Sequence, residues 1–253
     1  MLEDLFNNKV WLTAIALNTV LGIIALALPR RALTTAGIIH AWGLGILLWG
    51  GLGWQGFAVM VCYFILGTAV TYVGRDIKEA RGIAEKRSGA RGPENLWGSA
   101  AVGAMCAVGY LIKPNPLWLL GYTASISAKL ADTCASEIGK AYGKHTYLIT
   151  NLQAVPPGTE GAVSIEGTLA GVVGALLIAL VGWSTQLIDS WDIPICVIAA
   201  FVANTLESLI GATLQNRYSW LTNELVNGIN TLTGASIAVA IQAVGKQIGH
   251  TLS

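Results

Sequence analysis

The sequence predicts an all-α protein, a polytopic membrane helix bundle with about seven to eight transmembrane helices. Hydrophobic residues make up 54% of the 253 positions, and charged residues only 11%. Soluble globular chains average about 25% charged residues, and the mean hydropathy of this chain is +0.60. Apolar stretches of about 20 residues, the length of a helix that crosses a bilayer, also recur along the chain.

Eight such stretches follow one another. The last is the weakest, because Asn223, Asn227 and Asn230 dilute its apolar character. The connections are too short for a further domain, so residues 1–253 are expected to form a single transmembrane domain. The predicted spans cover approximately residues 10–28, 33–51, 53–72, 95–112, 117–139, 163–184, 193–212 and 222–245.

The basic residues predict the orientation of these spans, because lysines and arginines accumulate in cytoplasmic loops. Eleven of them fall in alternate connections and three on the opposite side. The connections that include residues 73–94 and 140–162 should therefore face the cytoplasm or stroma, with both termini on the other side. The eleven are Arg30, Arg31, Arg75, Lys78, Arg81, Lys86, Arg87, Arg91, Lys140, Lys144 and Arg217, and the three are Lys9, Lys113 and Lys246.

Composition also excludes several kinds of site. The net charge of +1 argues against a nucleic-acid partner. Cys62, Cys106, Cys134 and Cys196 are scattered without a CxxC pair, which favours packing over a disulfide framework or zinc site. His40 stands alone in the second span and is expected to be a hydrogen-bonded packing residue.

Charged residues in the fifth span point to a functional site, because ionisable groups at membrane depth are costly. Lys129, Asp132, Ser136 and Lys140 share one helix face, with Glu137 at its edge. Magnesium is usually held by one or two carboxylates plus substrate phosphates, which suits Asp132 and Glu137, with either lysine neutralising phosphate oxygens. The alternative is a Lys129–Asp132 pair that only neutralises itself.

A polar loop, residues 139–162, follows this span and ends in PPGTEG. Its glycine-rich turns can expose backbone amides to phosphate groups, although Pro-Pro-Gly is also an ordinary turn signal. The next helix begins at SIEGT, where Ser164 and Glu166 can line a site or simply cap the helix. The expected binding residues here are Thr150, Pro157, Gly158, Thr159, Gly161, Ser164, Glu166 and Gly167.

The seventh and eighth spans bring further polar residues to the same side of the membrane. Asn204, Glu207 and Ser208 share a face of the seventh, and Glu207 is a further candidate metal ligand. Asn227 lies on a stripe of asparagines in the eighth, which could bind a ligand or bridge helices. The basic loop 74–94 is a solvated cap, an anionic-lipid contact or a phosphate-recruiting lid, and the first two interpretations are the default for most of its charges.

The motifs AKLADTCASEIG, LIT, VPPGTEGAVSIEGTLAG, ESLIGATLQ and NELVNGINT, with LTTAG near Leu33, resemble the membrane family that contains the phytyl-phosphate kinase of vitamin E synthesis. That family is in turn distantly similar to CTP-dependent dolichol and phytol kinases. One departure is Glu207, where relatives commonly have Asp.

The resemblance implies phosphoryl transfer from a nucleoside triphosphate, expected to be CTP, to an isoprenoid monophosphate such as phytyl phosphate. The diphosphate product would serve tocopherol or phylloquinone synthesis. By motif position, Asp132 and Glu137 would be metal or catalytic residues, and the cofactor would be Mg²⁺. Lys129, a catalytic candidate from its place on the helix face, is less general in the family than Asp132. Thr150 to Gly161 would contact the nucleotide, and Ser164, Glu166 and Gly167 would close the pocket.

Such a kinase needs a cation-charged pocket for the nucleotide and an apolar groove for the lipid chain, and its partners would include membrane lipids. Two alternatives remain open. One is a kinase of the free alcohol, phytol or dolichol, which would benefit from a general base. The other is an ion-coupled secondary transporter, although no internal repeat is evident and the acids gather toward one face.

Overall fold

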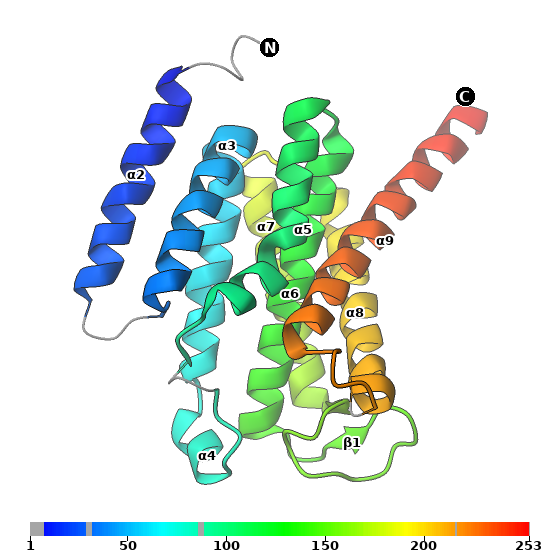
Figure 1. Cartoon of the computed structure of the whole chain (residues 1–253). Helices are drawn as coiled ribbons and strands as arrows, with labels where there is room; N and C mark the ends of the chain where they lie inside the picture. Colours follow the sequence, from blue (N-terminus) through cyan, green and yellow to red (C-terminus); the bar gives the residue numbers. More distant parts are fainter. Residues whose placement is uncertain (1–7, 29–31, 86–88, 216, 253) are drawn as a thin grey trace.

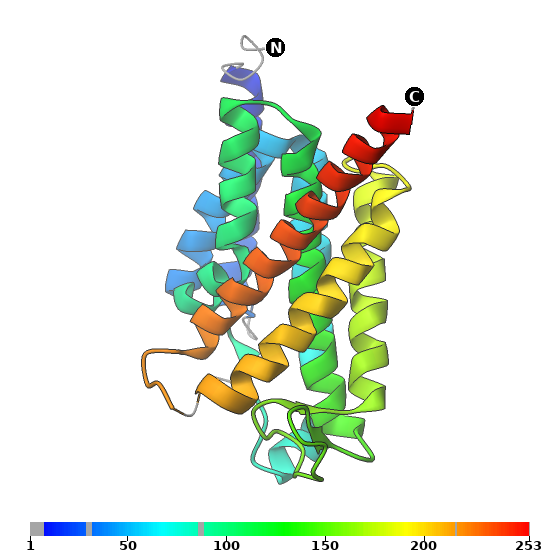
Figure 2. The same cartoon turned by 90° about the vertical axis from the view of Figure 1, so that its right-hand side faces the viewer.

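The computed structural model describes residues 8–28, 32–85, 89–215 and 217–252, and these residues form one helical bundle (Figures 1 and 2). The all-α membrane architecture predicted from the sequence is confirmed. A short antiparallel ladder pairs Tyr147 with Val163 and Leu148 with Ala162. In chain order the elements are α2 (Asn8–Ala27), α3 (Thr35–Tyr72), α4 (Arg75–Ala80), α5 (Pro93–Ile112), α6 (Pro116–Tyr142), β1 (Tyr147–Leu148), β2 (Ala162–Val163), α7 (Ile165–Ser184), α8 (Asp192–Ile210), the π-helical turn η2 (Gly211–Gln215) and α9 (Asn223–Leu252).

Each of the eight predicted spans corresponds to helix in the structure. Six helices of the described chain are long and apolar enough to cross a membrane: α2, α3, α5, α7, α8 with η2, and α9. The 38 residues of α3 hold two of the predicted spans, 33–51 and 53–72. The predicted span 117–139 is α6, whose polar residues set it apart from the six apolar helices.

Gly53 divides α3 into an ascending and a descending half (Figure 1). Its φ of 70° and ψ of −173° lie in a region that only glycine adopts readily. The reversal brings both ends of α3 to Arg91: the backbone of Thr34 donates to the Arg91 carbonyl at 3.0 Å, and the guanidinium lies against Gly67. A straight helix rises about 1.5 Å per residue, so residues 34 and 67 of such a helix would lie too far apart to contact the same residue.

Helix α6 runs through the interior of the bundle and is packed between α3, α5, α7, α8 and α9. Its residues from Leu120 to Ala131 are all buried. Small residues allow this close packing: a Cβ on Gly234 of α9 would lie 2.7 Å from Ala128, and one on Gly167 of α7 would lie 2.6 Å from the Ala135 carbonyl. The polar helix is thus shielded from lipid by its neighbours.

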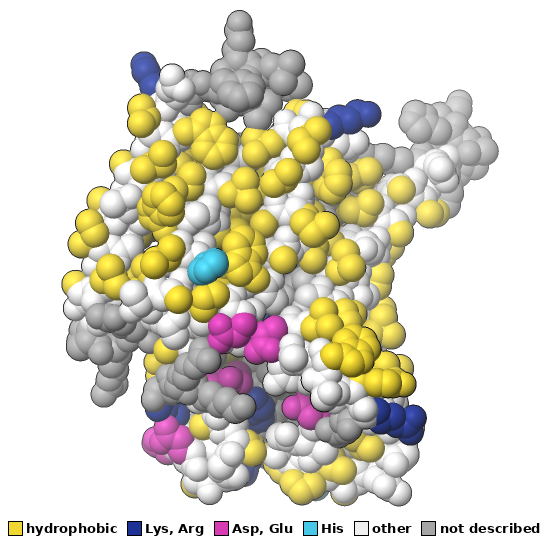
Figure 3. Space-filling view, viewed as in Figure 1, with side chains coloured by type: hydrophobic (Ala, Val, Ile, Leu, Met, Phe, Trp, Pro, Cys, Tyr) yellow, Lys and Arg dark blue, Asp and Glu magenta, His cyan; other side chains and the backbone are white. Residues whose placement is uncertain are grey.

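The surface is apolar along the bundle and charged toward its ends (Figure 3). Helix α2 presents Leu12, Ile23 and Ile24, each more than half exposed, as expected for side chains that face lipid. All four cysteines are free thiols, two buried and two half-buried, in agreement with packing roles. His40 accepts a hydrogen bond from Trp97 at 3.0 Å and is exposed rather than buried.

The basic residues segregate between the two ends of the bundle as predicted. Lys9 and Lys113 lie at the end that carries both termini (Figure 1). Arg30, Arg31, Lys86 and Arg87 lie outside the described residues, as does the side chain of Lys246. The described basic residues at the opposite end, near α4 and β1, are Arg75, Lys78, Arg81, Arg91, Lys140, Lys144 and Arg217.

Replacing Gly53 with Ala should destabilise the protein by about 1–3 kcal/mol, because a Cβ makes this backbone conformation strained. Thermal unfolding of the purified protein in detergent measures the effect. Gly43→Ala is the matched control, since a Cβ at Gly43 meets nothing within 4 Å and its backbone is helical. Equal melting temperatures for the two variants would show that α3 does not depend on a reversal at Gly53.

Candidate active site

A cavity of about 820 Å³ lies at the end of the bundle that carries α4 and β1. Its walls come from α6, Tyr63 and Thr71 of α3, the start of α7, the end of α8 with η2, the starts of α5 and α9, and loop residues within 83–85, 89–91 and 146–163. In Figure 3, acidic side chains gather around this hollow below the apolar surface. Fourteen of the seventeen predicted site residues line it: Lys129, Asp132, Ser136, Glu137, Lys140, Gly158, Thr159, Gly161, Ser164, Gly167, Asn204, Glu207, Ser208 and Asn227.

Lys129 and Asp132 form the ion pair that the sequence suggested, one turn apart on α6. The Lys129 ammonium donates to Asp132 Oδ2 at 2.5 Å and to Asn227 Oδ1 of α9 at 2.8 Å. Both charged residues line the cavity, and the Asp132 side chain is 18% exposed. The hydroxyl of Ser136 donates to the Asp132 carbonyl at 2.9 Å. The pair therefore neutralises charge and also leaves the Asp132 carboxylate accessible from the cavity.

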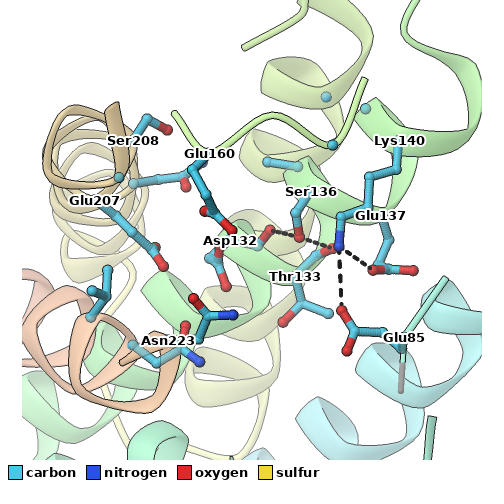
Figure 4. Close-up of a pocket in the computed structure, with 18 of the residues that line it drawn as sticks. Glu85, Asp132, Thr133, Ser136, Glu137, Lys140, Glu160, Glu207, Ser208 and Asn223 are labelled. Atoms are coloured by element: carbon cyan, nitrogen blue, oxygen red, sulfur yellow. Dashed lines mark hydrogen bonds and ion pairs between the residues drawn. The ribbon is translucent and has the colours of Figure 1, made fainter. Parts of the chain in front are cut away.

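Glu207 of α8 points toward Asp132 across the cavity (Figure 4). The two carboxyl groups face the same cavity, where their charges interact. Asn230 of α9 fixes Glu207 by donating from Nδ2 to Oε2 at 2.5 Å. The Oδ1 atom of this buried asparagine has no hydrogen-bond partner within the described chain. Two adjacent carboxylates repel each other when both are ionised, so the arrangement favours a bound cation between them.

The loop after α6 folds back on itself and onto the end of α8. The Thr146 hydroxyl donates to the Val155 carbonyl at 2.7 Å, and the Ile149 amide donates to the Gly161 carbonyl at 3.1 Å. A Cβ on Gly161 would lie 2.6 Å from the Ser208 carbonyl, so the loop and α8 are in close contact. Gly158, Thr159 and Gly161 line the cavity, whereas Thr150 and Pro157 do not.

The start of α7 contributes a helix cap as well as a cavity wall. Ser164 accepts a hydrogen bond from the Gly167 amide at 3.1 Å, the geometry of an ordinary N-cap. Both residues are buried and line the cavity. Glu166 lies in the first turn but outside the cavity lining, which fits the capping alternative for its carboxylate.

Glu137 forms a buried ion pair with Lys78. From the sequence alone, Lys78 is one of the charges of loop 74–94, most of which are expected to contact solvent or anionic lipid. Lys78 of α4 is 1% exposed and Glu137 is 2% exposed. The Lys78 ammonium donates to Glu137 Oε2 and to the Thr71 carbonyl. Lys140 approaches Glu137 Oε1 at 3.5 Å and Glu85 at 3.3 Å (Figure 4). The carboxylate of Glu137 thus joins α4 to α6 and is less available to a metal than that of Asp132.

Several further cavity residues were not identified from the sequence. Glu160 lies inside the PPGTEG motif and points into the cavity (Figure 4). Glu224, beside the Asn223 stripe, accepts from Asn95 at 3.3 Å and joins α9 to α5. The PPGTEG motif pointed to the position of Glu160, and the asparagine stripe pointed to the position of Glu224. Nothing in the sequence distinguished Glu85, Arg91 or Asn95 from residues that face solvent.

Negative charge dominates the cavity. Its described lining includes seven carboxylates, Glu85, Glu94, Asp132, Glu137, Glu160, Glu207 and Glu224, against three basic residues, Arg91, Lys129 and Lys140. Across the described residues, no group of three or more His, Cys, Asp or Glu side chains is placed to hold a metal ion. The excess of acids gives the cavity a negative potential, which attracts cations.

Comparisons with known proteins give relatives along nearly the whole chain. The chain is 56% identical to an uncharacterized membrane protein of Synechocystis sp. over 241 residues, which cover 94% of this chain and 93% of the relative. It is 42% identical to the chloroplastic protein VTE6 of Arabidopsis thaliana over 93% of this chain and 73% of VTE6. An uncharacterized membrane protein of Methanocaldococcus jannaschii is 35% identical over 87% of this chain and 90% of its own length.

The model of the integral membrane protein family DUF92 matches residues 18–235. That range includes every predicted site residue. No solved structure matches the chain.

The buried Lys78–Glu137 pair predicts a large coupling between the two positions. Lys78→Met should destabilise the protein by about 3–5 kcal/mol, because it leaves a carboxylate buried without its main partner. Lys78→Met combined with Glu137→Gln should recover much of that loss in thermal unfolding. Additive effects of the two substitutions would contradict the pairing.

Arg75→Met is the control within the same helix. Arg75 pairs with Glu79 at 2.6 Å, but the two side chains are 34% and 50% exposed, so water reaches the pair. Exposed pairs contribute little to stability because water screens them. This variant should unfold at nearly the wild-type temperature.

Proposed function

The chain belongs to the DUF92 integral membrane family, and on this premise we propose that it is a membrane kinase of isoprenoid phosphates. It would transfer a phosphoryl group from a nucleoside triphosphate, CTP being the expected donor, to an isoprenoid monophosphate such as phytyl phosphate. The resulting diphosphate would serve tocopherol or phylloquinone synthesis. The identity with VTE6 supports a role in isoprenoid metabolism, and the carboxylate-rich cavity is the single observation that carries the reaction type.

Electrostatics explains why such a cavity suits phosphoryl transfer. A nucleoside triphosphate and a phosphate monoester both bring negative charge to a site that already holds more acids than bases. Coulomb repulsion between like charges is strong where water is partly excluded. Both substrates can bind together only if cations come with them, and kinases use magnesium ions in this way.

Asp132 and Glu207 fit the ligand set of Mg²⁺, which takes one or two carboxylates together with substrate phosphates and water. They come from different helices, point toward each other and are each held by a neighbouring amide or ammonium group. When bound, the ion would neutralise charge that develops on the transferred phosphoryl group. Lys129, already oriented by Asn227, would approach the same phosphate oxygens.

The remaining groups would position the substrates. Backbone amides of the loop from Gly158 to Gly161 lie at the cavity wall and can donate to nucleotide phosphates. The acceptor is itself an ionised phosphate, so it needs no strong general base, and positioning with charge neutralisation accounts for most of the rate. The excess of basic residues at this end favours a cavity open to the cytoplasm or stroma.

Purified protein given radiolabelled CTP, Mg²⁺ and phytyl phosphate should form labelled phytyl diphosphate. Asp132→Asn and Glu207→Gln should each lower kcat on the order of 100-fold or more, since each removes a charge that acts on the transferred group. Glu79→Gln, an exposed acid outside the cavity, is the control and should retain activity. Label that appears only with phytol would favour the alcohol kinase. Ion-coupled uptake in liposomes without phosphoryl transfer would favour the transporter.

Metal removal gives a second test of the same site. EDTA should abolish transfer, and added Mg²⁺ should restore it, because repulsion among the cavity acids and the phosphates returns without the ion. Fluorescence titration of a labelled nucleotide would then show weaker binding in EDTA than in Mg²⁺. Unchanged turnover in EDTA would contradict a metal-dependent reaction.

A further inference from the structure

Arg91 lines the cavity but takes part in none of the ion pairs described for the site. Lys129 is paired with Asp132, and Lys140 contacts Glu85 and Glu137. The Arg91 guanidinium, in contrast, has no carboxylate partner and no side-chain hydrogen bond among the described residues. It lines the cavity and is half-buried. Five N–H donors in a rigid planar fork are thus available to a ligand.

The surroundings hold this side chain in place without using its donors. The Arg91 backbone donates to the Ala32 carbonyl at 2.9 Å and accepts from Thr34 at 3.0 Å. The guanidinium carbon lies 5.6 Å from the Tyr63 ring centroid and 6.0 Å from that of Phe64. Cation–π contacts with these two rings, together with the backbone hydrogen bonds, restrain the position of the guanidinium, so part of the cost of ordering it for an anion is already met.

We propose that Arg91 binds the phosphate of the acceptor lipid, an inference that rests on the kinase function proposed above. A guanidinium can donate two parallel hydrogen bonds to two oxygens of one phosphate. In a cavity rich in carboxylates, a guanidinium that is not paired with any of them attracts the negatively charged substrate that the acids would otherwise repel. Tyr63, whose ring the Arg91 guanidinium faces, lines the same cavity as Lys129 and Asp132. A phosphate on Arg91 would therefore share this cavity with Lys129 and Asp132.

Position in the fold assigns Arg91 to the lipid rather than to the nucleotide. Arg91 packs on the descending half of α3 at the start of α5, and both helices are membrane spans. The glycine-rich loop packs on the end of α8 through Gly161 and reaches Ile83 through Gly158, whereas the guanidinium of Arg91 lies against Gly67 and Tyr63 of α3. Trp97 of α5 and Leu225 of α9 are exposed apolar side chains that neighbour the cavity residues Asn95 and Glu224 in sequence, and they would provide a surface for a hydrocarbon chain.

Binding of phytyl phosphate in EDTA, where no transfer occurs, tests the proposal. Isothermal titration of the detergent-solubilised protein should show Kd raised on the order of 10- to 100-fold by Arg91→Met, the cost of losing a charge-assisted hydrogen-bond pair. Arg91→Lys should fall between that variant and wild type, because an ammonium keeps the charge but loses the fork. Affinity for phytol and for CTP should stay unchanged.

Gly67→Ala tests the same contact without altering the arginine. A Cβ at Gly67 would lie 3.1 Å from Arg91 Nη2, so it should displace the guanidinium and weaken phytyl phosphate binding. Gly43→Ala in the same helix is the control, with no neighbour within 4 Å. Wild-type binding of phytyl phosphate by both Arg91→Met and Gly67→Ala would overturn the proposal.

Two outcomes separate this inference from the kinase function. If phosphoryl transfer occurs but Arg91→Met weakens only CTP binding, Arg91 belongs to the nucleotide subsite and the proposal fails while the function stands. If no transfer occurs but phytyl phosphate binding depends on Arg91, the subsite stands and the kinase function fails.

Discussion

The charged residues of α6 have to be kept from contact with lipid, and the packing of the other helices follows from that requirement. An ionised side chain in hydrocarbon is costly, so α6 occupies the interior and five helices surround it. Gly167 and Gly234 let two of those helices approach its backbone closely. Helix α3, which turns back at Gly53, packs on another side of α6. The cavity forms where the helices end and the acids of several elements meet.

The two ion pairs of α6 have different consequences. Lys78–Glu137 is almost completely buried and joins α4 to the bundle. Lys129–Asp132 lies at the cavity wall, and the carboxylate also faces Glu207. Charge neutralisation is therefore complete around Glu137 and incomplete around Asp132. A carboxylate whose charge is not fully neutralised can still bind magnesium together with a phosphate, so we propose the metal site at Asp132 and Glu207. Glu137, whose charge is neutralised by lysines, is given a positioning role instead.

Sequence periodicity and hydropathy were sufficient for the membrane bundle, its helices and fourteen of the 38 residues that line the cavity, because apolar length and shared helix faces are local properties. They also separated residues 33–51 from residues 53–72 as two spans, and the break at Gly53 confirms that separation, although the sequence did not mark Gly53 as the turning residue. Lys78 and Arg91 looked alike as loop cations, yet one is buried against Glu137 and the other lines the cavity. Glu166 adjoins Gly167 in the motif but lies outside the cavity lining. Such differences depend on contacts between residues far apart in the chain.

The position of the metal tests this account most directly. An experimental structure of the protein with Mn²⁺ in place of Mg²⁺ and a non-hydrolysable CTP analogue would locate the ion by anomalous scattering. Our account predicts one peak in contact with Asp132 and Glu207 and with nucleotide phosphate oxygens, and an intact Lys78–Glu137 pair. A peak coordinated by Glu137 with Lys78 displaced, or a nucleotide bound without any metal, would contradict it.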